Sequence, residues 1–425
     1  MRIEKARIKE SNDHQLARHN GQLSFLKQQL QPEIDLETII SLLQDFQIAI
    51  PSWALGAGGT RFGRYSIGGE PSSLDEKICD VAIINDLTKS TASISLHIPW
   101  DVPEDSVAVK EFAASLEITF DAVNSNTFQD QPEQEYSYKF GSLSHIKKKV
   151  RNQAIDHNIQ VIEYGKALGS KSITVWLADG TSFPGQSNFR TSMKNTQSSL
   201  KEIYNALPED WKMLIEYKPY EPNFYSMVIP DWGTSSMLAE GCGENAFTLV
   251  DLGHHLPNTN IEQIVAVLIL KEKLGGFHFN DSKYGDDDLT TGSVKPYQLF
   301  LIFNELVMGM SNDSSANDLA WMIDASHNIK DPLEDLMQSV EAIQVAYTQA
   351  LLIDRNMLSQ AQNENDVVVC QELLQNAFGT DVRPLVREAR IRNGGSIDPL
   401  SIFREMNVRE KLIEERGKSS RATGL

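Results

Sequence analysis

The sequence predicts an α/β fold: a parallel (β/α)8 barrel with helices before it and a helical arm after it. Three observations lead to this expectation. Eight short β-rich runs recur along the chain, they end in polar or aromatic residues, and stretches that read as helix lie between most of them. A doubly wound open sheet is the alternative, and it would usually carry a Gly-rich phosphate loop after its first strand. Segment 56–64 is Gly-rich but does not read GxGxxG, and no clear helix directly follows it, so we interpret it as a loop.

The elements follow in order along the chain. Three parts are expected, namely an N-terminal helical segment, a catalytic barrel and a helical C-terminal extension, which span residues 1–45, 46–330 and 331–425. The eight strand runs span residues 47–53, 93–101, 115–124, 172–179, 213–219, 246–255, 276–281 and 319–328. Helical stretches between them include residues 72–87, 144–168, 261–274 and 296–308. The last begins with proline, whose missing N–H costs nothing in the first turn of a helix. The C-terminal extension is either an oligomerisation arm or a solvated helical extension.

Composition argues against several classes of protein. Among 425 residues, 58 acids outnumber 39 bases, so the net charge of −19 disfavours binding to nucleic acid or to an anionic membrane. Cys79, Cys242 and Cys370 lie far apart without a CxxC pair, which fits a reducing compartment and not a disulfide framework. The first residues do not read as a secretory signal, and the longest apolar run, 264–270, falls short of the roughly 20 residues of a membrane helix. We therefore expect a soluble cytoplasmic protein.

Ionisable side chains gather after the strand runs, where barrel enzymes place their active sites. Five of the nine histidines follow such runs, namely His97, His254, His255, His278 and His327. Four candidate ligands come from the fifth to the eighth runs: Glu216, Asp251, His278 and Asp324. Because these runs would be adjacent in the barrel, we expect the four side chains to converge on one cation. Carboxylates and imidazoles without cysteine suit Mn²⁺, Mg²⁺ or Co²⁺ better than a structural zinc.

A second set of ligands lies around the first. His254 is three residues past Asp251, and Asp286 and Asp288 would point to the same side of an extended loop. With Glu216 as a bridging carboxylate they could hold a second ion, and two ions together clamp adjacent oxygens of a substrate. The alternative for residues 286–288 is a solvated acidic loop.

Other candidates face the same mouth. His97, on the second run, could move a proton to or from a substrate hydroxyl. Lys218 follows Glu216 by two residues, so it points the same way and could donate to a substrate oxygen or simply balance the carboxylates. Trp53 and Trp176 end strand runs, where aromatic faces can stack on sugar rings, although most strand tryptophans are core.

Seven segments together resemble the catabolic L-rhamnose isomerases, which belong to the xylose-isomerase-like barrel superfamily. The segments are 51–62, 95–101, 120–128, 215–222, 249–255, 275–288 and 322–328. The last four of the motifs are long and specific, and the resemblance covers residues 46–330. It implies a (β/α)8 barrel that interconverts L-rhamnose and L-rhamnulose, with two divalent ions per subunit. Mn²⁺ is expected first, and Co²⁺, Mg²⁺ or Zn²⁺ are the alternatives.

The resemblance also implies roles residue by residue. It assigns the first ion to Glu216, Asp251, His278 and Asp324, and the second to Glu216, His254, Asp286 and Asp288. It implies that His97 helps to open the sugar ring and that Lys218 and Trp176 contact the substrate. Phe62 matches an aromatic residue that the family contributes to a neighbouring subunit's pocket, and a homotetramer is expected. We expect Trp53 at the substrate as well. If hydrogen moves as a proton, a metal-held hydroxide or Asp324 is the first candidate base.

Three other functions remain open at this stage. A sugar epimerase of the same superfamily typically uses one metal and a free pair of glutamates, but Glu216 is the one evident strand-end glutamate. A metal-dependent endonuclease needs a basic groove, which the net charge opposes. A non-catalytic sugar-binding barrel would be signalled by lost metal ligands, and none is missing.

Overall fold

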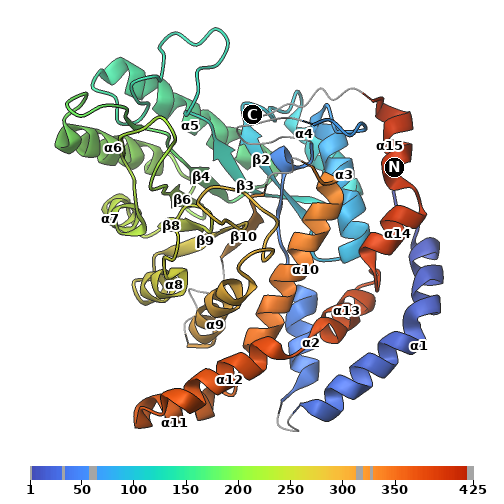
Figure 1. Ribbon diagram of the computed structural model, residues 1–425. Coiled ribbons are helices and arrows are strands. Elements are labelled where there is room, and N and C mark those ends of the chain that lie inside the picture. Colours follow the sequence, from blue (N-terminus) through green and yellow to red (C-terminus); the bar gives the residue numbers. More distant parts are fainter. Residues whose placement is uncertain (1, 31–33, 57–64, 313–318, 326–328, 419–425) are drawn as a thin grey trace.

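The computed structural model describes residues 2–30, 34–56, 65–312, 319–325 and 329–418 (Figure 1). Its centre is a parallel sheet of eight strands in the order β1-β2-β3-β4-β6-β8-β9-β10. The strands are β1 (Ile50–Pro51), β2 (Ser93–Ile98), β3 (Thr119–Ser125), β4 (Ser172–Val175), β6 (Lys212–Glu216), β8 (Ala246–Asp251), β9 (Leu274–Phe279) and β10 (Ala320–Ile323). Each predicted run overlaps one of these strands, so the prediction of a (β/α)8 barrel is confirmed.

The first and last strands meet through a single bridge that closes the barrel. Ala49, just before β1, bridges Met322 of β10. The Ala49 N–H donates to the Trp321 carbonyl at 2.7 Å, and the Ile323 N–H donates to the Ala49 carbonyl at 3.2 Å. This seam is short because β1 has only two residues.

Eight helices form the outer layer of the barrel (Figure 1). They are α3 (Leu74–Thr88), α4 (Ser106–Ser115), α5 (Lys148–Leu168), α6 (Phe189–Tyr204), α7 (Trp232–Cys242), α8 (Ile261–Leu270), α9 (Pro296–Asn312) and α10 (Pro332–Leu351). Side chains cap most of the N-termini, as when Asp331 accepts from the first N–H groups of α10. The predicted helix over 261–274 ends at Leu270 instead, because the chain must turn and enter β9 at Leu274.

The remaining elements lie outside the barrel ring. N-terminal helices α1 (Lys5–Gln29) and α2 (Leu36–Asp45) both pack against α13 (Arg383–Arg392), so the two ends of the chain lie side by side, blue beside red in Figure 1. The other C-terminal helices are α11 (Arg355–Glu364), α12 (Val367–Gly379), α14 (Pro399–Glu405) and α15 (Val408–Arg416). The 3-10 helix η1 (Ser52–Ala54) follows β1, and β5 (Gly180–Thr181) pairs antiparallel with β7 (Ser226–Met227).

Helix α10 bears on where the barrel ends. It packs against α9 and α3, so it belongs to the outer ring although it begins after residue 330. The division of the chain at residues 45 and 330, and the role of the C-terminal extension in subunit contacts, stay predictions. No helix in the described ranges is long and apolar enough to cross a membrane.

The barrel interior is filled by small and aliphatic side chains below the site. Ala122 of β3, Leu214 of β6 and Leu249 of β8 form a buried cluster across the barrel. A Cβ atom on Gly276 of β9 would collide with the Ala320 carbonyl of β10, so a larger residue would push these strands apart. His278 lies two residues further along β9, on the same side of the strand.

Candidate active site

Four ligand side chains converge at the carboxyl ends of neighbouring strands. Glu216 ends β6, Asp251 ends β8, His278 lies on β9 and Asp324 follows β10. One ligand atom from each lies within 4.8 Å of the others. The His278 Nδ1 atom is central: it is 3.3 Å from Glu216 Oε1, 3.4 Å from Asp324 Oδ2 and 3.8 Å from Asp251 Oδ2. The structure therefore brings together the whole first set of predicted ligands.

The chemistry of this cluster fits a divalent cation. His278 Nδ1 is buried and makes no hydrogen bond within the described part of the chain, although three carboxylates surround it. Burial disfavours a charged imidazole, yet Glu216 and Asp324 outweigh it and raise the pKa of His278 to about 10. Burial raises the pKa of Asp251 to about 6. The raised pKa values mean that the cluster binds protons, which offset its excess of negative charge. A cation can take the place of these protons, and oxygen and imidazole donors are suited to a hard cation.

Asn280 and the chain after β8 hold Asp251 in place. Asp251 Oδ1 accepts hydrogen bonds from Gly253 N at 2.7 Å, His254 N at 3.1 Å and Asn280 Nδ2 at 3.0 Å. Such outer contacts orient a ligand and are part of a metal site. Sequence reasoning missed Asn280, although it directly follows the FHF run of β9 within the 275–288 motif.

The second predicted set is only partly assembled. His254 lies between two carboxylates, with Nδ1 3.1 Å from Glu216 Oε1 and Nε2 3.1 Å from Asp286 Oδ1. Burial opposes the charged ring, but Asp251 and Asp286 raise the pKa of His254 well above its usual value. Asp288 is buried in the same loop, but no hydrogen bond or ion pair joins its side chain to His254. Within the described residues, the first set is the only group of three or more ligand atoms at metal-binding spacing.

The loop that carries these aspartates is not extended, so the expectation of an extended loop over residues 286–288 was wrong. Asp286 and Asp288 have φ angles of 54° and 48°, in the left-handed region. Asp287 between them accepts the N–H groups of Lys283 at 2.7 Å and Tyr284 at 3.0 Å, which folds the loop back on itself. The alternative of a solvated acidic loop also fails, because Asp286 and Asp288 are buried.

Lys218 lies beside this loop. Its Nζ atom donates to Asp286 Oδ2 at 2.7 Å and to Glu221, and it sits 5.2 Å from the centre of the Trp176 ring. Both partners are carboxylates, so Lys218 offsets negative charge here, which is one of the two roles considered for it. Trp176, the other predicted substrate contact on this side, is half-buried just after β4.

His97 faces the cluster from β2 inside an aromatic enclosure. Its ring stacks on Trp100 at a centroid distance of 4.3 Å, and Trp53 and Phe128 meet it edge-on at 5.3 and 5.6 Å. Burial lowers the pKa of His97 to about 4, so the ring is neutral at neutral pH and can accept a proton. Sequence reasoning missed Trp100 and Phe128, although they lie in segments 95–101 and 120–128.

Trp53 and Asp101 tie His97 to the rest of the site. The Trp53 Nε1–H donates to Asp324 Oδ1 at 2.8 Å, so its edge holds a cluster carboxylate. Buried Asp101 accepts the His97 main-chain N–H at 2.8 Å, and it also accepts from Ser52 and from Lys77 at 2.6 Å. This carboxylate joins β2, η1 and α3 beneath the site, and sequence reasoning missed it. Phe62 and His327 lie outside the described residues.

The low pKa of His97 has a consequence for stability. In the unfolded chain the imidazole takes a proton below its ordinary pKa of 6.5, whereas the folded ring resists protonation down to a pKa of about 4. The neutral ring therefore contributes stability above pH 6.5 that is lost as the pH falls to 4, up to about 3 kcal/mol. The free energy of unfolding of chelator-treated protein, measured with urea at pH 7 and pH 4, should fall by about 3 kcal/mol less in His97→Gln than in the wild type. Equal acid destabilisation of the two proteins would contradict it.

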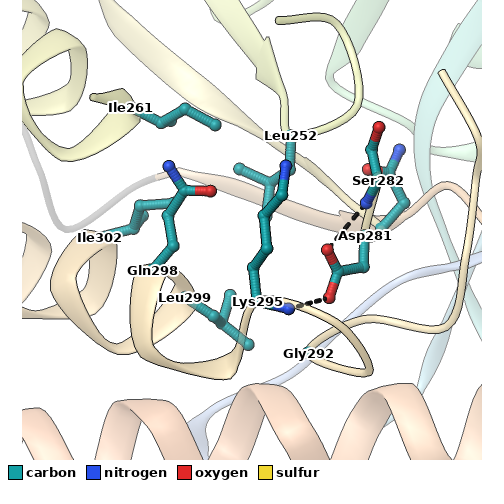
Figure 2. Close-up of a pocket in the computed structure, with 10 residues that line it drawn as sticks. Leu252, Ile261, Asp281, Ser282, Gly292, Lys295, Gln298, Leu299 and Ile302 are labelled. Atoms are coloured by element: carbon teal, nitrogen blue, oxygen red, sulfur yellow. Dashed lines mark hydrogen bonds between the residues drawn. The ribbon is translucent and has the colours of Figure 1, made fainter. Parts of the chain in front are cut away.

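A small cavity behind the site is too small for a substrate (Figure 2). It lies between Leu252, Asp281 and Lys295, and its volume of about 20 Å³ holds about one water molecule. Figure 2 shows Asp281 accepting from Ser282 N and from Lys295 N, the latter at 2.8 Å. Asp281 and Leu289 also exchange main-chain hydrogen bonds of 2.8 and 2.9 Å. Asp281 therefore anchors the base of the loop that carries Asp286.

Comparisons with known proteins give two close relatives. A probable sugar isomerase of Rhizobium meliloti is 51% identical over 383 residues, which cover 90% of this chain and 89% of that protein. A probable sugar isomerase of Mesorhizobium japonicum is 50% identical over 383 residues, with the same coverage. Among solved structures, one of L-ribulose 3-epimerase covers 76% of this chain and 98% of its own, with a TM-score of 0.52 and 15% identity, and it supports the barrel fold alone. No protein-family model matches the chain.

Proposed function

This chain belongs to the family of these two probable sugar isomerases, and from that premise we propose a metal-dependent aldose–ketose isomerase that interconverts L-rhamnose and L-rhamnulose. The observation that carries the proposal is the convergence of Glu216, Asp251, His278 and Asp324 on one buried point at the barrel mouth. The neutral His97 faces this point from β2. The choice of L-rhamnose rests on the resemblance of the strand-end motifs to the catabolic L-rhamnose isomerases.

In this proposal two sets of ligands would each hold a divalent ion. Glu216, Asp251, His278 and Asp324 would hold the first ion, and Glu216, His254, Asp286 and Asp288 would hold a second. We propose Mn²⁺, with Co²⁺, Mg²⁺ or Zn²⁺ as alternatives. When bound, divalent ions supply the Lewis acidity that polarises two neighbouring sugar oxygens.

Side chains of the protein move the proton, exclude water and place charge at the site. The neutral imidazole of His97 takes the proton of the anomeric hydroxyl as the bond between C1 and the ring oxygen breaks, and it passes the proton to the ring oxygen, which becomes a free hydroxyl. Ring closure reverses this transfer. Trp53, Trp100 and Phe128 surround that imidazole and exclude water from it. Lys218 keeps a positive charge beside Asp286 and the ring of Trp176.

A direct assay tests the proposal. The purified protein is incubated with Mn²⁺ and a panel of aldoses and ketoses, and the products are separated by chromatography. We expect L-rhamnose to give L-rhamnulose with the highest kcat/KM of the panel. A ketose converted into its C3 epimer, or an aldose other than L-rhamnose converted much faster, would overturn the assignment.

Hydrogen is expected to move between C2 and C1 mainly as a hydride. A proton route needs a free base between the two carbons, but the candidate carboxylates are assigned to the ions, and Asp286 is also paired with Lys218. L-rhamnose deuterated at C2, turned over in ordinary water, should give ketose with deuterium at C1. Unlabelled sugar turned over in D₂O is the control and should gain little label. Extensive washout at early turnover would instead indicate an enediol route, with Asp324 as the first base to test.

We also propose that the active form is a cytoplasmic homotetramer, as the resemblance implies, with a small sugar as its substrate and no nucleic acid or membrane partner. Sedimentation velocity measures the subunit number. Phe62 is the residue proposed to reach a neighbouring subunit's pocket.

A further inference from the structure

Asn126 directly follows β3, at the carboxyl end of the strand and so at the mouth of the barrel. Its main-chain N–H donates to the Ile98 carbonyl at 3.0 Å, which continues the β2–β3 ladder one residue past the end of β3. Ala122 of the same strand packs across the barrel against Leu214. Pairing between β2 and β3 is regular from Val123 onward, and Asn124 reaches the Ser95 side chain of β2. Because side chains alternate along a strand, Asn126 faces the same side as Asn124.

The carboxamide of Asn126 is buried without a partner. The residue is 1% exposed, and neither its Oδ1 nor its Nδ2 atom makes a hydrogen bond within the described part of the chain. Asn124, two residues earlier on the same face, is different: its Nδ2 donates to Ser95 Oγ at 3.1 Å and to the Leu96 carbonyl at 3.0 Å. Buried polar groups in native proteins are almost always paired, so the unpaired amide requires an explanation.

The strands on either side show the same pattern. His97 Nδ1 on β2 and Trp176 Nε1 after β4 are also buried atoms without a hydrogen-bond partner among the described residues. In the strand order, β2, β3 and β4 lie across the barrel from β8, β9 and β10, which contribute most of the cation cluster. The unpaired donors and acceptors thus lie on the side of the barrel opposite the ligand cluster. A hydroxyl group, which both donates and accepts, can form hydrogen bonds with them.

We propose that Asn126 is a specificity-determining residue, whose carboxamide binds a hydroxyl of the sugar beyond the two oxygens that the cations polarise. This inference rests on the proposed function, because it takes a polyhydroxylated substrate as given. It adds a contact with the sugar that the metal ligands and the aromatic residues around His97 do not provide. In this proposal the Asn124 side chain stabilises the fold, whereas the Asn126 side chain binds the substrate.

The matched pair Asn126→Ala and Asn124→Ala tests this division. Asn126→Ala should lower kcat/KM by about 10- to 100-fold, because the sugar hydroxyl loses its buried partner, while Tm stays unchanged or rises. Asn124→Ala should lower Tm by about 2–4 °C, because it breaks two buried hydrogen bonds. Asn126→Asp, of the same shape, keeps an acceptor but loses the donor, and it provides the measurement if the alanine variant does not fold.

Monodeoxy sugars identify the hydroxyl. Removing the hydroxyl that Asn126 binds should lower kcat/KM for the wild type by about 10- to 100-fold but cause no further loss in Asn126→Ala. Unchanged kcat/KM in Asn126→Ala, with discrimination against every deoxy sugar retained, would mean that an ordered water pairs with the amide, and it would overturn the proposal.

Binding measurements separate this inference from the reaction assignment. Calorimetry with the same sugars reports the Asn126 contact even if the wild type converts no aldose. If the wild type binds the sugar in an Asn126-dependent way but does not convert it, only the proposed isomerase reaction is overturned. Binding that is equal in the wild type and Asn126→Ala would overturn the inference alone.

Discussion

Replacing His278 with alanine is expected to remove the bound divalent ion and to lower kcat/KM by at least about 10³-fold. The Nδ1 atom of His278 lies within 3.8 Å of Glu216, Asp251 and Asp324, so its loss removes the central donor of the cluster. The three carboxylates would then face one another without the imidazole between them. Metal content after gel filtration and initial rates with added Mn²⁺ measure the two effects.

Chelation and a control histidine complete this test. Exhaustive chelation of the wild type should produce the same loss, and Mn²⁺ should restore activity. His19, which is buried on α1 and bonded to Glu388 at 2.9 Å, is the matched control, and His19→Gln should keep both metal and activity. Full activity after exhaustive chelation, or wild-type metal content in His278→Ala, would show that the cluster does not serve as the metal site.

The second large effect is expected from His97→Ala, with kcat/KM lower by about 10²–10⁴-fold and metal content unchanged. His97 lies on β2, opposite β8 in the closed strand order, and its ring contacts Trp53, Trp100 and Phe128 instead of a carboxylate. Its removal takes away the proton acceptor while the cluster keeps every ligand. Steady-state rates and metal analysis of the same preparation measure both properties. A wild-type rate, or loss of the ion, would mean that His97 has another role.

The barrel and the first ligand set could be predicted because both depend on strand order. Glu216, Asp251, His278 and Asp324 each end or follow a β-rich run, and parallel strands bring their carboxyl ends to one edge. The second set depends on a loop. The directions of Asp286 and Asp288 are set by the N–H groups that Asp287 accepts and by left-handed φ angles, which periodicity does not reveal.

Side-chain hydrogen bonds mark the other limit of prediction. Trp53 was expected to offer a stacking face, but its indole N–H is used to hold Asp324. Nothing in the sequence distinguishes Asn126 from Asn124, since both are asparagines on the same side of the chain at the end of β3. The difference lies in their partners: Ser95 and Leu96 reach Asn124 and do not reach Asn126.

The short seam between β1 and β10 is joined to the ligand cluster through Trp53. One bridge at Ala49 joins these strands, and above it Trp53, after β1, holds Asp324, after β10, at 2.8 Å. A cation bound by Asp324 would therefore also stabilise the bridge between β1 and β10 that closes the barrel. In the metal-free protein, the N–H groups of Ala49 and Ile323 should exchange with solvent deuterium sooner than those of β3 and β4. Metal binding should slow deuterium exchange at Ala49 and Ile323 more than in β3 and β4. The stability of the barrel seam would then depend on whether the metal site is occupied.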